Sequence, residues 1–344
     1  MTAALPEDLV ARITAMPKVE LHVHLEGAQT PETVWAMAER NEVALPARSL
    51  EEWRSFYAFR DFAHFIQVYI ASSRAMLTAQ DFHDMTAAFH EYQARQHILY
   101  TEAFLSASLF VDRIPWPDLF AAFREGLATG RARHGVEVRL IPDIARNFPS
   151  SKRAVLDFTR AGFEEGVFIG LGLGGLETGY PAEDFTAEFR EAREAGMRVV
   201  AHAGETEGAH SVRGAIEALG AERIGHGIRC LEDPELVALL RDRQVPLEVC
   251  PMSNYRTTVV AADDPHPILA MMALGLNCTV NSDDPPMFST SLTEEYLYLA
   301  SQGVPWEQLW ALNRNALEVS FLGEEEKAPL RARLDAFEAS LPGG

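Results

Sequence analysis

The chain has 344 residues, of which 47% are hydrophobic and 23% are charged, so its composition excludes a disordered chain and suits a large buried core. Its formal net charge of −20 argues against nucleic acid as a partner, because phosphate backbones attract basic surfaces. No apolar run reaches the roughly 18 residues of a membrane span, and the N-terminus lacks a signal-peptide pattern, so we expect a cytoplasmic protein.

Two histidines share one face of the first predicted strand. Apolar residues alternate with polar ones over residues 19–26, so at a period of two the side chains of His22 and His24 point the same way. Two imidazoles on one face can share a metal ion. A helix over 7–16 is predicted before this strand, and Thr30 with Pro31 predicts the start of a helix after it.

The segment that follows the first strand is long and helical, with predicted helices at 61–76 and 79–95. Along the first of these helices, large apolar side chains recur at helical spacing, namely Phe62, Phe65, Ile66 and Tyr69. Such a stripe usually packs into the core. The alternative is an apolar lid over a pocket.

From residue 98 onward, short apolar runs alternate with helical segments. The predicted strands are 98–105, 137–142, 167–173, 198–203, 223–226, 246–250 and 277–281, and the predicted helices are 116–130, 150–164, 182–195, 211–219, 233–242 and 265–274. Two or three further helices fit 290–341. Eight repeats without a linker predict one α/β domain over residues 1–344, a (β/α)8 TIM barrel with extra helices after strand 1 and at the C-terminus.

Polar residues gather where the predicted strands end, which is where the chemistry of such barrels takes place. The fifth strand leads into His202 and Glu205, and the sixth ends at His226. The eighth is followed by Asp283 and Asp284. Each of these alone could be a loop anchor or a turn. Together with the histidine pair, they predict a metal site.

The predicted ligands are three imidazoles and one carboxylate, from His22, His24, His202 and Asp283. This set suits zinc and leaves one position for a water, whose pKa on zinc falls to about 7. Glu205 and His226 then remain as acid–base groups, so hydrolysis is the expected reaction. The fourth strand contains no lysine that could bridge two ions, which favours one zinc ion per chain.

These residues, in this order, resemble the adenosine deaminase family of the amidohydrolase superfamily. The resemblance spans nearly the whole chain and is carried by residues 22–24, 170–177, 202–205, 225–227, 250–254 and 282–285. It implies a zinc-dependent enzyme of purine metabolism that converts a 6-aminopurine to a 6-oxopurine and releases ammonia.

The resemblance also implies a role for each residue around the substrate. A protonated Glu205 would donate to purine N1, which makes C6 electrophilic. His226 and Asp283 would orient the attacking water and take its proton. Asp284 would hydrogen-bond N7, and the backbone of Gly175 would meet N3.

Three positions bear on which aminopurine is the substrate. Adenosine deaminases usually have aspartate where this chain has Glu26, and the longer side chain would occupy the space of a ribose 5′-hydroxyl. Phe104 stands where they tend to have arginine, as in adenine-type enzymes, whereas Gly225 matches the nucleoside type. We therefore predict a 5′-modified adenosine such as the 6-aminodeoxyfutalosine of menaquinone biosynthesis, with Phe65 and Tyr69 packing on the 5′ substituent. Adenosine and the free base adenine are the alternatives.

Two other classes of protein stay open on the sequence alone. The same metal would serve a hydrolase acting on an amide or ester, although Glu205 and Asp284 would then lack purine partners. A zinc-stabilised binding protein without catalysis would not need the acid–base residues. No heptad or exposed apolar stripe indicates an oligomeric state.

Overall fold

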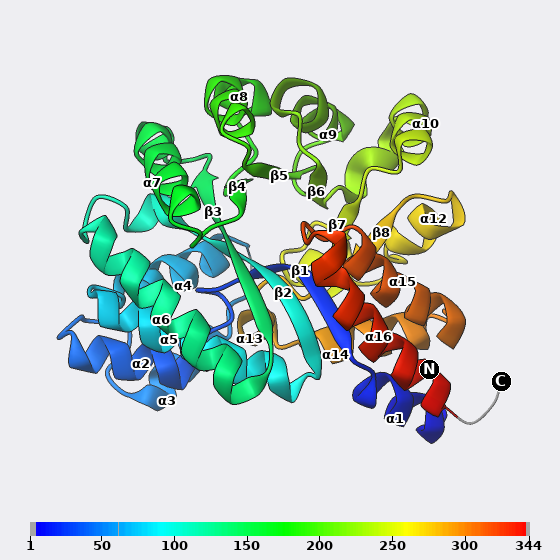
Figure 1. Cartoon of the computed structure of the whole chain (residues 1–344), viewed down its shortest axis with the longest axis horizontal. Helices are drawn as coiled ribbons and strands as arrows, with labels where there is room; N and C mark the ends of the chain where they lie inside the picture. Colours follow the sequence, from blue (N-terminus) through cyan, green and yellow to red (C-terminus); the bar gives the residue numbers. More distant parts are fainter. Residues whose placement is uncertain (1–4, 61, 342–344) are drawn as a thin grey trace.

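The computed structural model describes residues 5–60 and 62–341. Eight strands form a single sheet in the order β1 to β8, each parallel to the next (Figure 1). They are β1 (Lys18–His24), β2 (Ile98–Leu105), β3 (Glu137–Ala145), β4 (Gly170–Gly174), β5 (Arg198–Ala203), β6 (Arg223–His226), β7 (Leu247–Val249) and β8 (Cys278–Val280). A bridge between Val23 and Asp283 joins the two edges of the sheet. The (β/α)8 barrel is therefore confirmed.

Most strands lie where the sequence places them, and β2, β5 and β6 agree with the prediction to the residue. The fourth strand differs, because it begins at Gly170 instead of residue 167. Phe168 pairs with Leu140 only through an isolated bridge, since the chain there is still leaving helix α7 (Lys152–Glu164).

Helices cover the outside of the barrel between successive strands (Figure 1). They are α6 (Trp116–His134), α7, α8 (Thr186–Glu194), α9 (Ala209–Gly214), α10 (Pro234–Arg243) and α12 (Ile268–Ala273). The helix predicted over 211–219 is α9 followed by a π-helical turn at Ala215–Leu219. A short helix, α11 (Pro251–Arg256), follows β7 and was not predicted.

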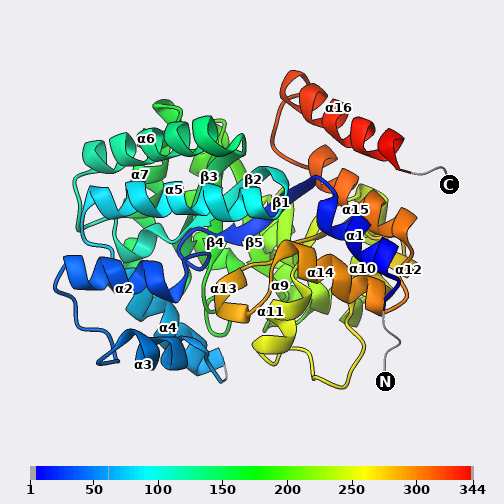
Figure 2. The ribbon, with the colours of Figure 1, turned by 90° about the horizontal axis from the view of Figure 1, so that it is seen from below.

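Four helices form the insertion after β1 and lie together on one side of the barrel (Figure 2). They are α2 (Pro31–Arg40), α3 (Leu50–Tyr57), α4 (Phe62–Arg74) and α5 (Ala79–Arg95). The Thr30 side chain accepts from the Thr33 amide and caps α2, as Thr30-Pro31 predicted. Helix α3 was missed, although Ser49 caps it in the same way.

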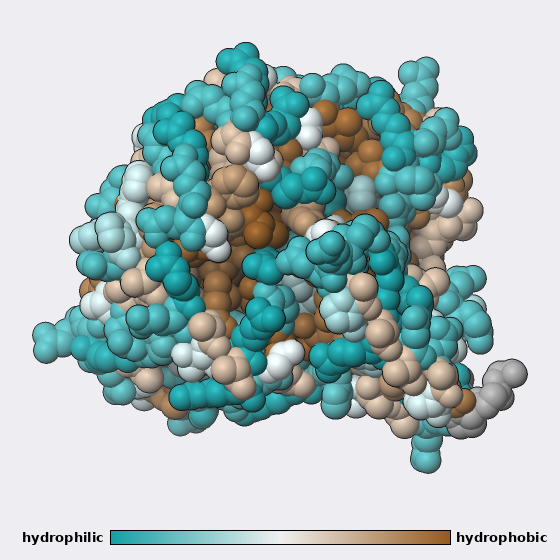
Figure 3. All heavy atoms as spheres, viewed as in Figure 1, coloured by the Kyte–Doolittle hydropathy of each residue, from teal (hydrophilic) through white to brown (hydrophobic). Residues whose placement is uncertain are grey.

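The remaining helices are α1 (Glu7–Ala15), α13 (Pro285–Phe288), α14 (Leu292–Ser301), α15 (Trp306–Glu318) and α16 (Glu324–Ser340). Helix α16 packs on the outside of α15 (Figure 2). Hydrophilic side chains form most of the face in Figure 3, with apolar atoms visible mainly in recesses between helices. Throughout the described ranges, no helix combines the length and apolar character needed to cross a membrane. A single domain over 1–344 and a cytoplasmic location stay predictions.

Candidate metal centre and active site

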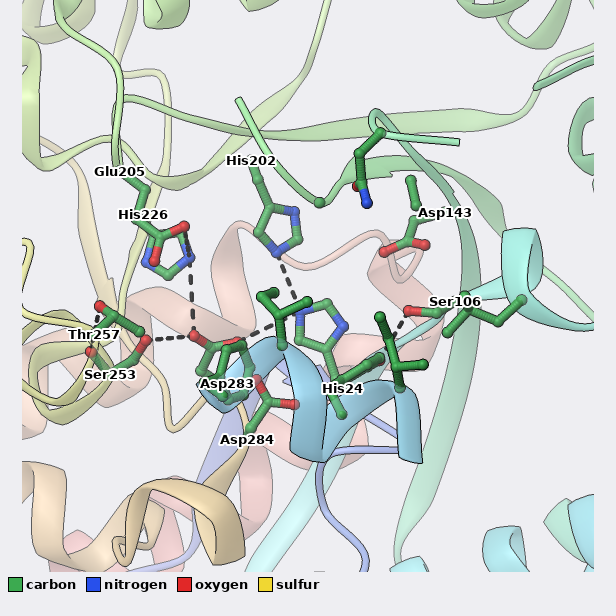
Figure 4. A pocket seen from close by; sticks show the side chains of 18 of the residues that line it. His24, Ser106, Asp143, His202, Glu205, His226, Ser253, Thr257, Asp283 and Asp284 are labelled. Carbon is green, nitrogen blue, oxygen red and sulfur yellow. Dashed lines mark hydrogen bonds and ion pairs between the residues drawn. The ribbon is translucent and has the colours of Figure 1, made fainter. Parts of the chain in front are cut away.

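The barrel brings three histidines and an aspartate together at the carboxyl ends of β1, β5 and β8, and Figure 4 shows three of the four, His24, His202 and Asp283. His24 Nε2 lies 3.2 Å from His202 Nε2 and 3.4 Å from Asp283 Oδ1. His22 Nε2 lies 3.6 Å from the same oxygen. All four side chains are buried. They are residues that the sequence predicted as ligands, and the fold places them side by side.

The hydrogen bonds on the far side of two rings leave their Nε2 atoms free to act as ligands. His202 Nδ1 lies 2.9 Å from the Leu173 carbonyl oxygen and donates to it, so its Nε2 carries a lone pair. His22 Nδ1 lies 3.0 Å from Glu248 Oε2, while within the described chain His22 Nε2 has no hydrogen-bond partner. Lone pairs that converge beside a carboxylate fit a borderline divalent cation such as zinc.

His226 lies close to the four candidate ligands, but its ring faces the carboxyl group of Glu205. Atoms of His22, His202, His226 and Asp283 all lie within 4.8 Å of one another. However, His226 Nε2 is 3.7 Å from Glu205 Oε2 and 3.9 Å from Asp283 Oδ2, so its ring lies on the side of the acid. His24 Nε2 lies nearer to the aspartate than His226 Nε2 does and contacts His202 Nε2 directly, which favours His24 as the third imidazole.

Two buried acids beside the cluster have raised pKa values. Burial, reinforced by the nearby Asp283, raises the pKa of Glu205 to about 8. The same two causes raise the pKa of Asp284 well above its usual range. Both groups line the cavity, so each can donate a hydrogen bond to a ring nitrogen.

Asp284 has room because residue 27 is a glycine. A Cβ atom on Gly27 would lie 1.4 Å from Asp284 Oδ1, which no side chain could tolerate. The glycine that ends the histidine strand motif therefore sets the position of an acid that comes more than 250 residues later in the chain.

Two site residues adopt a left-handed backbone conformation, His226 with φ of 60° and Asp283 with φ of 64°. This conformation costs roughly 1–2 kcal/mol for a residue other than glycine. Hydrogen bonds offset that cost at Asp283, where the His24 amide donates to its carbonyl at 2.9 Å and its own amide donates to the His22 carbonyl at 3.1 Å. Ser253 Oγ also donates to Asp283 Oδ2 at 2.6 Å.

A buried ion-pair chain, missed by the sequence analysis, lies behind His22. Glu248 on β7 contacts His22 through one oxygen and Arg223 Nε through the other, at 2.6 Å. Arg223 in turn contacts Glu102 Oε2 at 2.6 Å, and the Phe321 ring covers its guanidinium group. The signal in the sequence was a single acid within the otherwise apolar strand 247–249.

Helix α4 supplies an apolar wall to the cavity. Phe65 and Tyr69 line it together with Ile66 and Ile70, so the stripe faces the pocket as a lid would. The side chain of Phe62 lies outside the described residues. Gly175 also lines the cavity, in a left-handed conformation with φ of 79°.

Glu26 is not part of the cavity wall. Its Oε1 accepts a hydrogen bond from the Ser106 amide at 2.9 Å, and Ser106 Oγ lies 2.8 Å from the Tyr69 hydroxyl. Ser106 and Tyr69 do line the cavity, so Glu26 lies one residue behind its surface.

Gly225 is explained by the packing of His22. A Cβ atom at position 225 would lie 2.7 Å from His22 Cε1, so a larger residue would displace a candidate ligand. The absence of a side chain at this position leaves room for the His22 ring.

Comparison with known proteins extends this picture. The model of the family described as "Adenosine deaminase" matches residues 17–337. An adenine deaminase of Geotalea uraniireducens is 36% identical over 334 residues, which are 96% of this chain and 94% of that protein.

Two solved structures share the fold over nearly the whole chain. The crystal structure of adenine deaminase from Arthrobacter aurescens has a TM-score of 0.89 at 35% identity and covers 95% of this chain and 100% of its own. An amidohydrolase from Burkholderia ambifaria with bound Zn has a TM-score of 0.89 at 28% identity, covering 98% and 94%.

Proposed function

The chain belongs to the adenosine deaminase family and is a hydrolytic aminopurine deaminase; from this premise we propose that its substrate is the free base adenine, converted to hypoxanthine and ammonia. The observation that carries the proposal is the similarity to adenine deaminases at 35–36% identity, over 94% or more of their length.

The free base was the alternative in the sequence analysis, and it now has better support than the 5′-modified nucleoside. Phe104 fits the adenine type, and Glu26 lies behind the cavity surface, so it gives no support to a 5′ substituent. Gly225 remains the one of the three positions that matches the nucleoside type. None of the relatives described above supports a nucleoside of menaquinone biosynthesis.

The residues around the cavity divide the proton transfers between them. Glu205 donates its proton to N1 of adenine and so makes C6 electrophilic. His226 Nε2, with Asp283, accepts a proton from the water as its oxygen bonds to C6. The proton taken up by His226 and Asp283 then passes to N6, the C6–N6 bond breaks and ammonia leaves. The remaining hydroxyl proton returns to Glu205, which leaves a 6-oxo group on the ring. Asp284 holds N7 and the Gly175 amide holds N3, which fixes the plane of the ring.

We propose one zinc ion per chain, held by His22, His24, His202 and Asp283. When bound, zinc lowers the pKa of water and so supplies a nucleophile near neutral pH. The structural support is the convergence of buried Nε2 atoms beside one carboxylate oxygen.

Ammonia release on a panel of adenine, adenosine and 5′-modified adenosines tests the substrate. The zinc-loaded protein should show a kcat/KM for adenine at least about 100-fold above that for either nucleoside, because a pocket that hydrogen-bonds a free base rejects an analogue without the same polar groups. Faster turnover of a nucleoside would refute the free-base proposal. Metal analysis of the same sample tests the zinc stoichiometry.

A further inference from the structure

One buried acid in the cavity has no role in the reaction described so far. Asp143, at the carboxyl end of β3, is 2% exposed and lines the same cavity as Glu205 and Asp284. Its Oδ1 is buried and, in the part of the chain that the structure describes, has no hydrogen-bond partner. Burial, with the charge of Glu26, raises the pKa of Asp143 well above its usual range. A buried polar group without a partner costs stability, so the fold gains nothing from this carboxyl group.

The neighbouring strand leaves room for Asp143. Gly172 on β4 pairs with Asp143, and a Cβ atom on it would lie 3.0 Å from the Asp143 Cβ. A Cβ on Gly174 would lie 2.7 Å from Asp143 Oδ2. Side chains at these positions would push the carboxyl group from its place. Gly172 and Gly174, two of the three glycines of β4, thus leave the space that Asp143 occupies.

Asp143 lies across the cavity from the proton-donating acid. Figure 4 shows it beside Ser106, with His24 and His202 between it and Glu205. In the described chain, the acids that line the cavity are Asp143, Glu205, Asp283 and Asp284. The proposed reaction uses the last three.

The substrate has one ring nitrogen without a partner. In the proposed function, Glu205 meets N1, Gly175 meets N3 and Asp284 meets N7, which leaves N9. In free adenine the nitrogen at this position can carry a hydrogen, whereas in a nucleoside it carries the sugar carbon. A donor on the ligand and an unpaired acceptor on the protein therefore remain.

We propose that Asp143 is a specificity-determining residue that accepts a hydrogen bond from N9–H of the free base. The inference rests on the proposed function. A carboxyl group offers an acceptor oxygen whether or not it is ionised. A nucleoside cannot donate from N9 and would leave the carboxyl group buried and unpaired, so it is rejected.

The test compares adenine with 9-methyladenine, which lacks the N9 hydrogen, in the zinc-loaded wild type and in Asp143→Ala. We expect the variant to lose roughly 10- to 100-fold in kcat/KM for adenine, the usual effect of losing a hydrogen bond to a carboxyl group. For 9-methyladenine the value should change by less than about threefold, because no such bond exists to lose. The ratio of kcat/KM for adenine to kcat/KM for 9-methyladenine should therefore be smaller in Asp143→Ala than in the wild type.

The same two substrates are compared in Asp143→Leu, in which apolar atoms fill the space of the carboxyl group. This variant should keep at least the wild-type Tm and zinc content, because it removes an unpaired buried carboxyl group. Asp112→Ala, which changes an exposed aspartate in the loop before α6, is the matched control. It should leave kcat/KM for both substrates unchanged. Equal losses for both substrates, or no loss for adenine, would overturn the inference. A wild type without activity on adenine would instead refute the proposed function on which it rests.

Discussion

Glu205 is a carboxyl group that the protein keeps neutral by burying it beside Asp283. If its proton is what activates the ring, Glu205→Gln should still bind zinc, because Glu205 is not among the proposed ligands. Its kcat should fall by about 10²- to 10⁴-fold, the usual contribution of a general acid. Steady-state assays with metal analysis check this. Full activity in a zinc-loaded Glu205→Gln protein would remove Glu205 from the mechanism.

A site residue could be predicted from the sequence where an unusual polar residue stands at the end of a predicted strand. His202 and Asp283 are unusual polar residues at strand ends, so their types and places in the repeat pointed to the site. Asp143 was missed because a lone acid after a proline is typical of a turn, and only the sheet register reveals the glycines opposite it. The left-handed backbone of His226 has no sequence signal at all.

Arg223 ties three strands together, because it bridges Glu102 on β2 and Glu248 on β7 from its own position on β6. Arg223→Met would leave both carboxylates buried without their partner, and we expect it to lower the free energy of unfolding by about 3–5 kcal/mol. Urea unfolding at fixed zinc measures this. Arg153→Met, at an exposed ion pair on α7, should cost no more than about 1 kcal/mol. Similar losses of unfolding free energy in the two variants would contradict a structural role for the buried ion pairs of Arg223.

Strands were easier to predict than helices in this protein. Strands buried on both faces read as short apolar runs with clear ends, which is why β2 and β5 agree with the prediction. Helix α3 has eight residues and buries only Trp53 and Tyr57, so its periodicity is too brief to recognise. The π-helical turn after α9 depends on packing, and its sequence looks like ordinary helix.

The proposed zinc site links β1, β5 and the end of β8, which are far apart in the chain, and β5 is separated from β1 and β8 by other strands of the barrel. Bound metal should therefore stabilise the whole barrel, by about 4 kcal/mol when free zinc is a thousand times its Kd. Thermal unfolding before and after chelation, and after zinc is returned, measures the effect. Glu205→Gln should show the same shift in Tm, whereas His24→Ala should lose most of it. A Tm that does not respond to zinc would argue against the site.

The bridge between Val23 and Asp283 has a consequence for how the molecule assembles. The hydrogen bonds that join the two edges of the sheet are made by the backbones of His22, His24 and Asp283, whose side chains form the proposed site. The first and last strands must meet before these groups can face one another. A chain still emerging from the ribosome, with its eighth strand unmade, therefore has no active centre. The amide hydrogens of His24 and Asp283 should exchange with solvent only when the barrel opens.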